Sequence, residues 1–382
     1  MKEIYFDNSA TTPLSSAARA ALNESADIYA NPSSLHRLGF ESQKKLEGAR
    51  EAIAKTLYCD KSEIIFTACG TESDNTAILG GAEVFSAMLK KEGVPPRIIT
   101  TDSEHPAVSE PVRILENKGF EVIRLSTKKG VLDMAEVTKA ATKNVCLATI
   151  MHTNNETGAV YDLKSVFSVI RKNSPRAILH TDAVQGYLHS RIRPSVIGAD
   201  LISISGHKVH ALKGIGVLYK KKGVRILPFM AGGGQESGFR SGTENLTGIL
   251  TLAAAAKDGF DNFDIYSERI RNVRNALISA LSEIDGVHFN IPEKSFSENI
   301  LSIQVEGEKS EVLLHKLSDM NVFVSSGSAC SSKKGKSGVL RSFGLTDIEA
   351  DRTIRISLSH MNTEEEAHFF CEALEKVRNK VN

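Results

Sequence analysis

The 382-residue chain contains no tryptophan, and no two of its cysteines stand in CxxC spacing. It also lacks any run of about eighteen apolar residues, the length that a membrane-spanning helix needs, and the first residues, MKEIYFDNSATT, have no secretion-signal pattern. Its five cysteines are an odd number without zinc-type spacing, which argues against a disulfide framework and favours a soluble protein in the reducing cytoplasm. Net charge is small too, because 47 Lys and Arg offset 46 Asp and Glu. Bulk charge therefore gives no reason to expect a nucleic-acid or membrane partner.

Short β-rich runs alternate with amphipathic stretches between Glu63 and Tyr219, and these stretches predict helices over 75–90, 107–118 and 163–172. The expected strands are EIIFTA, RIITT, EVIRLS, VCLATIMH, AILHTDA, LISISG and IGVLYKK. Alternation of this kind predicts an α/β fold in which helices cover a mainly parallel seven-stranded sheet. Sheets of this class bind ligands at the carboxyl ends of their strands, so residues directly after these runs are the candidates for chemistry.

The pattern changes after residue 260. A long helix near 265–284 leads into further short strands, a helix near 311–317 and a last helix that begins near Thr363. This part predicts a smaller α+β domain. We expect a large domain over 13–260 and a small C-terminal domain over 261–382, joined by residues 1–12, with the Cys330 loop in the small domain.

Five of the predicted strands are followed by residues that could act on one ligand. These are Gly70 with Thr71, His105, Asn155, Asp182 with Gln185, and Lys208. Each also has an ordinary structural explanation, such as a capped helix, a turn, an N-cap or a solvated lysine. Thr71 and Asp74, for example, stand in capping-box spacing.

Taken together, these residues meet the needs of one cofactor. A helix start binds phosphate, and an imidazole held extended before Pro106 could stack on a flat ring. Asp182 needs a cation, which a protonated pyridine nitrogen would supply, and Gln185 could donate to a ring oxygen. A partly desolvated Lys208 favours Schiff-base chemistry. The set matches the requirements of pyridoxal 5'-phosphate.

The stretch SSGSACSS, 325–332, places one cysteine, Cys330, among small polar residues. Free cysteine is usually buried among apolar neighbours, so packing does not explain this placement.

The sequence resembles the cysteine desulfurases of the NifS/IscS type, within the fold type I, class V aminotransferase-like enzymes that use pyridoxal phosphate. The matching stretches run in family order from residue 6 to about 366, and they are FDNSATTP, NPSSLH, GTESDN, EHPAV, NNETG, HTDAVQ, SGHK, RSGTEN, SSGSACSS, IRISLS and TEEE. A single motif is weak, but eleven in order cover nearly the whole chain.

The resemblance implies a role for each candidate. Lys208 would hold the cofactor, Asp182 would pair with the ring nitrogen, Gln185 would bind the ring hydroxyl oxygen, and His105 would stack on the ring and handle protons. The expected phosphate ligands are Gly70, Thr71, Ser205 and His207, with Thr243 reaching the phosphate of a neighbouring subunit. That last contact implies a homodimer.

The expected substrate is L-cysteine. Arg355 would bind its carboxylate, with Asn155 and Asn31 close by. The Cys330 thiolate would take the sulfur as a persulfide and release alanine, and a mobile loop would carry it to an acceptor protein. The acceptor would be an iron–sulfur scaffold protein or a tRNA-thiolation enzyme. The alternatives are another reaction of the same fold, such as selenocysteine lysis or transamination, and a non-catalytic binding module; Cys330 argues against transamination.

Overall fold

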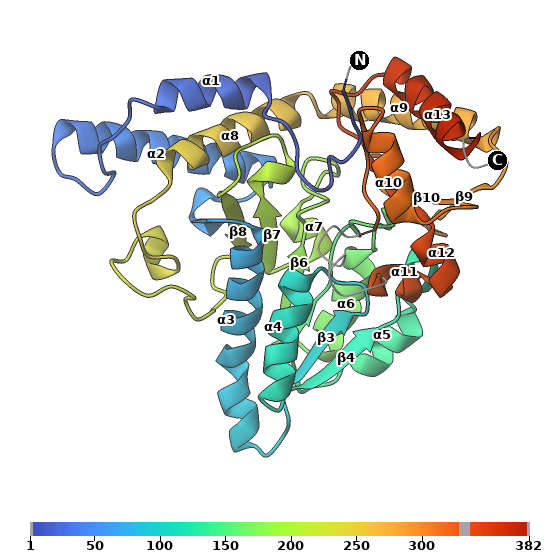
Figure 1. Cartoon of the computed structure of the whole chain (residues 1–382). Helices are drawn as coiled ribbons and strands as arrows, with labels where there is room; N and C mark the ends of the chain where they lie inside the picture. The colour runs from blue at the N-terminus through green and yellow to red at the C-terminus, as the bar shows by residue number, and fades with distance from the viewer. Residues whose placement is uncertain (1–2, 328–336, 380–382) are drawn as a thin grey trace.

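A seven-stranded sheet in the order β2-β8-β7-β6-β5-β3-β4 lies at the centre of the computed structural model, which describes residues 3–327 and 337–379 (Figure 1). Its strands are β2 (Ile64–Thr67), β3 (Arg97–Thr101), β4 (Glu121–Leu125), β5 (Val145–Thr149), β6 (Ile178–Asp182), β7 (Leu201–Ser205) and β8 (Gly216–Lys220). Strand β8 runs antiparallel to both of its neighbours, and the other pairings in this sheet are parallel. The mainly parallel seven-stranded sheet predicted from the sequence is confirmed.

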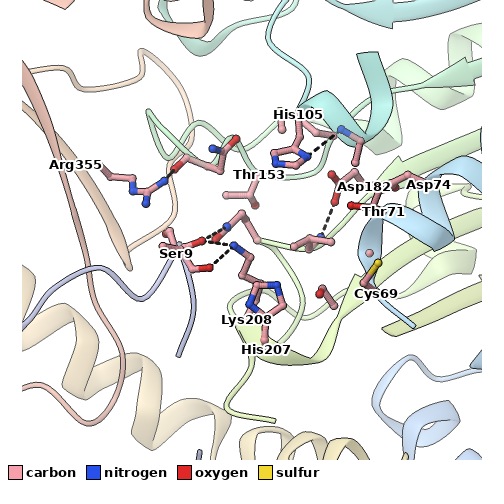
Figure 2. A pocket seen from close by; sticks show the side chains of 18 residues that line it. Ser9, Cys69, Thr71, Asp74, His105, Thr153, Asp182, His207, Lys208 and Arg355 are labelled. Carbon is pink, nitrogen blue, oxygen red and sulfur yellow. Dashed lines mark hydrogen bonds between the residues drawn. The ribbon is translucent and has the colours of Figure 1, made fainter. Parts of the chain in front are cut away.

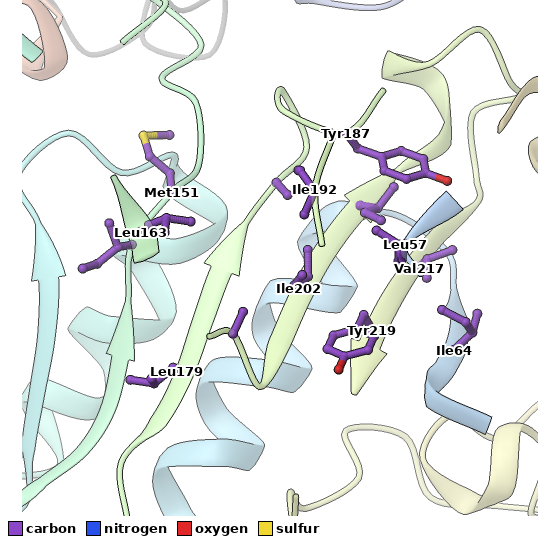
Figure 3. Packing of buried hydrophobic residues seen from close by; sticks show 14 of the residues in the cluster. Leu57, Ile64, Met151, Leu163, Leu179, Tyr187, Ile192, Ile202, Val217 and Tyr219 are labelled. Carbon is purple, nitrogen blue, oxygen red and sulfur yellow. The ribbon is translucent and has the colours of Figure 1, made fainter. Parts of the chain in front are cut away.

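Helices cover both faces of this sheet. They are α1 (Ser16–Ser25), α2 (Arg37–Thr56), α3 (Gly70–Lys91), α4 (Pro106–Asn117), α5 (Met134–Ala140), α6 (Leu163–Asn173), α7 (Pro194–Ile197) and α8 (Leu246–Asp261). Successive strand residues point to opposite faces, so Leu201 packs in the apolar cluster with α3 and α4, whereas Ile202 packs in the cluster with α2, α6 and α8 (Figure 3). Burial on both faces explains why these strands are nearly continuous apolar runs.

A second unit contains the C-terminal third of the chain and the N-terminal strand. Its elements are β1 (Ile4–Tyr5), α9 (Phe263–Ser282), β9 (Val287–Phe289), β10 (Ile300–Val305), α10 (Ser310–Ser318), β11 (Val322–Phe323), α11 (Gly338–Phe343), α12 (Asp347–Asp351), β12 (Thr353–Ser357) and α13 (Glu364–Asn379). Strands β12, β10 and β9 form an antiparallel sheet, and β1 pairs in parallel with β11. Ile4 and Phe6 share one apolar cluster with α9, α10 and α13, so the N-terminal strand packs with this unit. The exact domain boundaries stay a prediction.

Short 3-10 turns complete the secondary structure: η1 (Lys61–Glu63), η2 (Lys128–Gly130), η3 (Gly206–Lys208) and η4 (Glu236–Gly238). No described helix combines the length and the apolar composition that a bilayer crossing demands. Within 3–327 and 337–379, His, Cys, Asp and Glu side chains form no group suited to a metal ion.

Candidate active site

A cavity of about 290 Å³ lies where the strands of the large sheet end. Ten of the predicted site residues line it: Gly70, Thr71, His105, Asn155, Asp182, Gln185, Ser205, His207, Lys208 and Arg355. Nine of these end or follow strands β2, β3, β5, β6 and β7, and Arg355 comes from β12 of the second unit. Figure 2 shows that their side chains converge from both units on one space. The cavity is therefore built at the sheet edge where the sequence placed it.

Lys208 ends the short turn η3 directly after the buried strand β7. Its Nζ donates to two backbone carbonyl oxygens of the N-terminal segment, Ser9 at 2.5 Å and Ala10 at 2.9 Å (Figure 2). Gln185 Nε2 donates to the same Ser9 oxygen at 3.0 Å. Two carbonyl groups thus fix the lysine ammonium inside the cavity.

Asp182 ends strand β6 with only 6% of its surface exposed, and its Oδ1 accepts the Val184 N–H at 2.9 Å. Burial raises the pKa of this carboxyl, and the nearby His105 and Lys208 charges oppose that rise. A fixed cation beside Asp182 would stabilise the carboxylate, because a buried charge is costly without a partner.

A second carboxyl lies behind the first. Asp74, on α3, is almost completely buried, and burial together with the charge of Asp182 raises its pKa well above the usual range. Its Oδ1 has no hydrogen-bond partner among the described residues and lies 3.5 Å from His180 Nε2. The predicted capping box is wrong, because α3 already begins at Gly70 and Asp74 points inward.

The first turn of α3 forms a close-fitting wall of the cavity. A Cβ atom on Gly70 would lie 2.8 Å from Val184 Cγ2 and 3.3 Å from Ser205 Cβ, so only glycine fits without displacing a neighbour. Gly70 and Thr71 thereby bring the start of a 22-residue helix to the cavity, where unpaired backbone N–H groups favour an anion. Burial and neighbouring lysine charges lower the pKa of His207 to about 4, so its ring is neutral at pH 7.

His105 caps helix α4, and the proline after it occupies the first helical position. Its Nδ1 accepts the Ala107 N–H at 3.1 Å, so the neutral ring carries its proton on Nε2. Burial is the main influence on its pKa and lowers it, while the charge of Asp182 acts in the opposite direction. The residue is thus a structural cap and a cavity-lining imidazole at once.

Arg355 is 3% exposed and reaches the cavity from β12. Its Nη1 donates to the Asn155 carbonyl oxygen at 3.0 Å, and its Nη2 donates to Asp7 Oδ1 at 2.8 Å. Asn155 lies within a turn that the buried Asn154 builds, because Asn154 Oδ1 accepts the backbone N–H groups of Glu156 and Thr157. Of the NNE sequence, only Asn155 lines the cavity.

Two predicted residues do not line the cavity of the single chain, and a third is not described. Asn31 is exposed, and its Oδ1 accepts the Ser33 N–H at 2.9 Å. Thr243 is also exposed, as a residue meant for a neighbouring subunit would be. Cys330 and the loop expected around it lie outside the described residues, so the predicted mobility of that loop stays a prediction.

Sequence reasoning missed several contributors. Ser9 and Ala10 act through backbone oxygens, and Asp7 binds the arginine. The available signal was the polar run DNSATT directly after a short apolar stretch at the N-terminus. Cys69 also lines the cavity, where it precedes Gly70.

Comparison with known proteins identifies the family to which this fold and site belong. The Aminotransferase class-V family model matches residues 4–370. The chain belongs to the aminotransferase class-V family. Cysteine desulfurase IscS of Dictyoglomus turgidum is 37% identical to this class-V chain over 387 residues, covering 100% of this chain and 95% of that protein.

Solved structures of related proteins have the same fold as this chain. A structure described as a NifS-like protein superposes with a TM-score of 0.92 at 34% identity, covering 99% of this chain and all of that one. Another, described as SspA in complex with cysteine, has a TM-score of 0.81 at 31% identity over 94% of this chain and 99% of that chain. The resemblance to the NifS/IscS type is confirmed.

Proposed function

We propose that this protein is a cysteine desulfurase that uses pyridoxal 5'-phosphate. L-cysteine and the Cys330 thiol would become L-alanine and a Cys330 persulfide, so one sulfur atom moves and no external oxidant or reductant is needed. The observation that carries the proposal is the meeting of Lys208, the buried Asp182 and Arg355 at one cavity. The relatedness to proteins named cysteine desulfurase supports it.

The residues present fit the cofactor. Asp182 is a buried carboxyl in need of a cation, which the ring nitrogen would provide. The tight approach at Gly70 leaves backbone N–H groups of α3 for a phosphate, with Ser205 and His207 beside them. Lys208 is in place for a covalent bond to an aldehyde. When bound, the cofactor supplies the electron sink that stabilises negative charge at the substrate α-carbon.

The chain's own groups orient the reactants. The Ser9 and Ala10 oxygens hold the Lys208 amine toward the cavity, and Gln185 shares one of these oxygens. His105 keeps a neutral ring above the cavity with its proton on Nε2, because burial lowers its pKa. Arg355 offers a guanidinium to the carboxylate of the amino-acid substrate, a bidentate pairing that suits arginine.

The sulfur acceptor on the enzyme is Cys330, proposed from the sequence pattern. Four other cysteines, at 59, 69, 146 and 371, are free thiols. Burial raises the pKa of the Cys146 and Cys371 thiols to about 12, which makes them poor nucleophiles at neutral pH. A reducing compartment such as the cytoplasm suits a reaction that depends on a free thiol.

Two partners complete the proposal. In a homodimer, Thr243 of each chain would reach the phosphate site of the other chain. Thr243 and Asn31 are both exposed in the single chain, as such a contact between chains requires. The persulfide would pass to an iron–sulfur scaffold protein or a tRNA-thiolation enzyme.

A cysteine substitution tests the function. Cys330→Ala should remain yellow with bound cofactor but release no alanine or sulfide from L-cysteine in the presence of a reductant. Cys59→Ala, which changes a half-buried thiol away from the cavity, serves as the matched control and should keep the activity. Normal desulfuration by Cys330→Ala would contradict the mechanism and favour an activity that needs no thiol, such as transamination.

A further inference from the structure

Asp7 holds the arginine that faces the proposed substrate. Its Oδ1 accepts from Arg355 Nη2 at 2.8 Å, and the Asn155 carbonyl oxygen accepts from Nη1 at 3.0 Å. The third nitrogen, Nε, is buried and has no hydrogen-bond partner among the described residues. A guanidinium carries five N–H donors in one plane, so these two contacts fix the plane and leave a second N–H donor on each of Nη1 and Nη2.

The position of Asp7 is itself well determined. Asp7 forms a parallel bridge with Ser357, two residues beyond Arg355 on the strand β12. The next residue, Asn8, donates from its backbone N–H to the Ser357 carbonyl oxygen at 3.2 Å and from Nδ2 at 2.9 Å. The Asp7 side chain is 19% exposed and the Arg355 side chain 3%, so solvent screens this pair only weakly.

We propose that Asp7 is a positioning residue that orients the guanidinium of Arg355 toward the carboxylate of the substrate. The inference rests on the carboxylate-binding role of Arg355 in the proposed function. It extends that role to the N-terminal segment, which thereby sets the preference for an amino acid with a free α-carboxylate.

Two effects of neutralising Asp7 oppose each other. Loss of its negative charge makes the site more positive, which by itself would attract a carboxylate. The guanidinium would also lose the acceptor that fixes its plane, and bidentate binding requires two donors aligned with both carboxylate oxygens. Alignment decides the outcome, because a small misplacement of a buried positioning group weakens binding more than a general field strengthens it.

The test compares L-cysteine with L-cysteine methyl ester, which lacks the carboxylate charge. Asp7→Asn should lower the ratio of kcat/KM for L-cysteine to that for the ester about tenfold, mainly through a higher KM for L-cysteine, because one charge-assisted hydrogen bond is weakened. General damage to the fold would lower both values and leave the ratio unchanged. Glu121→Gln, which weakens a 2.8 Å ion pair with Arg97 on strands β3 and β4, is the matched control and should not change the ratio.

A binding measurement provides a readout other than turnover. Titration with L-alanine and with its methyl ester, followed by cofactor absorbance, should show weaker binding of L-alanine alone in Asp7→Asn. An unchanged ratio in Asp7→Asn, or tighter binding of L-alanine, overturns the inference. Arg355→Lys separates the two proposals: if it lowers the ratio while Asp7→Asn does not, only the role of Asp7 fails. If Arg355→Lys leaves the ratio unchanged, the role of Arg355 fails as well.

Discussion

Three acids in or beside the cavity are buried: Asp74 and Asp182, which line it, and Glu104, which precedes the cavity-lining His105. Burial is the main influence on each of their pKa values and raises it. Asp182 has a proposed cationic partner, whereas the negative charge of Asp182 raises the pKa values of Asp74 and Glu104 further. The two groups without a cation therefore carry a pH-dependent cost to stability.

Glu104 allows that cost to be measured. Burial raises its pKa to about 8 from an ordinary value of 4.5, so the folded protein keeps a proton that the unfolded chain loses as pH rises between these values. Stability contributed by this group is therefore present at low pH and is lost as pH rises toward 8. At pH 9, the free energy of unfolding of Glu104→Gln, measured by denaturant titration, should exceed that of the original protein by roughly 2 kcal/mol. This gain in stability should vanish near pH 5.

The glutamine can keep the two bonds that Glu104 Oε1 accepts, from Thr101 Oγ1 at 2.8 Å and from the Met151 N–H at 2.9 Å. Glu116→Gln is the control, because Arg124 lowers the pKa of that exposed glutamate and no gain with rising pH is expected. A gain for Glu104→Gln that is the same at both pH values would contradict the assignment.

At the scale of elements, helix α3 brings the sheet core and the cavity together. Its apolar residues Ala77, Ile78 and Ala82 pack against the central strands, and its first turn supplies the Gly70 wall. A long helix anchored by its middle holds its N-terminus in a fixed place, which is the condition for an anion site.

Gly70→Ala should weaken cofactor binding without unfolding the protein. The new Cβ would push Val184 toward the cavity that it lines, and we expect the cofactor dissociation constant to rise about tenfold, or about 1.4 kcal/mol. Gly48→Ala in α2 is the matched control, since a Cβ there meets nothing within 4 Å. That change should leave cofactor binding unaltered and raise stability by about 0.5–1 kcal/mol. Equal cofactor affinity in both variants would remove Gly70 from the site.

The sequence predicts the strands of the large sheet and the helices between them better than it predicts helices α2 and α8, which lie before and after that region. The helix predicted over 107–118 lies at Pro106–Asn117, and that predicted over 163–172 lies at Leu163–Asn173. Helices α2 and α8 had no prediction. Helix α2 buries small residues among its few large apolar ones, and the AAAA run of α8 is buried nearly all round, so neither has a clear apolar periodicity.

The same reasoning applies to the site. Residues at strand ends were predictable, because parallel strands end at one edge. The contacts of Lys208 with Ser9 and Ala10 were not, because they join backbone atoms 199 and 198 positions away along the chain. A backbone oxygen can accept a hydrogen bond whatever the residue type, and a residue type does not identify a partner far along the chain. Neither kind of contact can therefore be predicted from the sequence.

At the scale of the whole molecule, three histidines meet between the two units. His189 and His210 come from the large sheet unit, and His360 from the second one. The rings of His210 and His360 lie 4.7 Å apart, and His360 stacks on Tyr266 at 3.8 Å. Asp258 of α8 also lines this junction, and Arg269 of α9 acts on His360 electrostatically.

This junction should make stability depend on pH. Burial lowers the pKa of His189 to about 4 and that of His360 to about 3, and it lowers the pKa of His210 as well. The folded state thus keeps neutral rings while the unfolded chain takes up protons below about pH 6.5, so stability falls as pH falls from 7 to 5. Among the described residues, burial lowers the pKa of seven histidines in all. His360→Phe, which can retain the stack on Tyr266, should therefore reduce the histidine part of that fall by roughly a seventh in thermal unfolding measurements.

The control for this prediction is His288→Gln, since His288 is exposed and pairs with Glu306 away from the junction. It should leave the pH profile unchanged. A His360→Phe variant as sensitive to acid as the original protein would assign the acid response to other groups.

The N-terminal segment has a consequence for how a newly made chain matures. Asp7, Ser9 and Ala10 are made well before Ser357, yet Asn8 is bound to Ser357, 349 positions later. Ribosomes add roughly 5–20 residues each second, so tens of seconds separate the synthesis of this segment from that of Ser357. Asp7 can therefore hold the arginine of the cavity in its final place only after synthesis has passed residue 357, so the cavity is completed late in the synthesis of the chain.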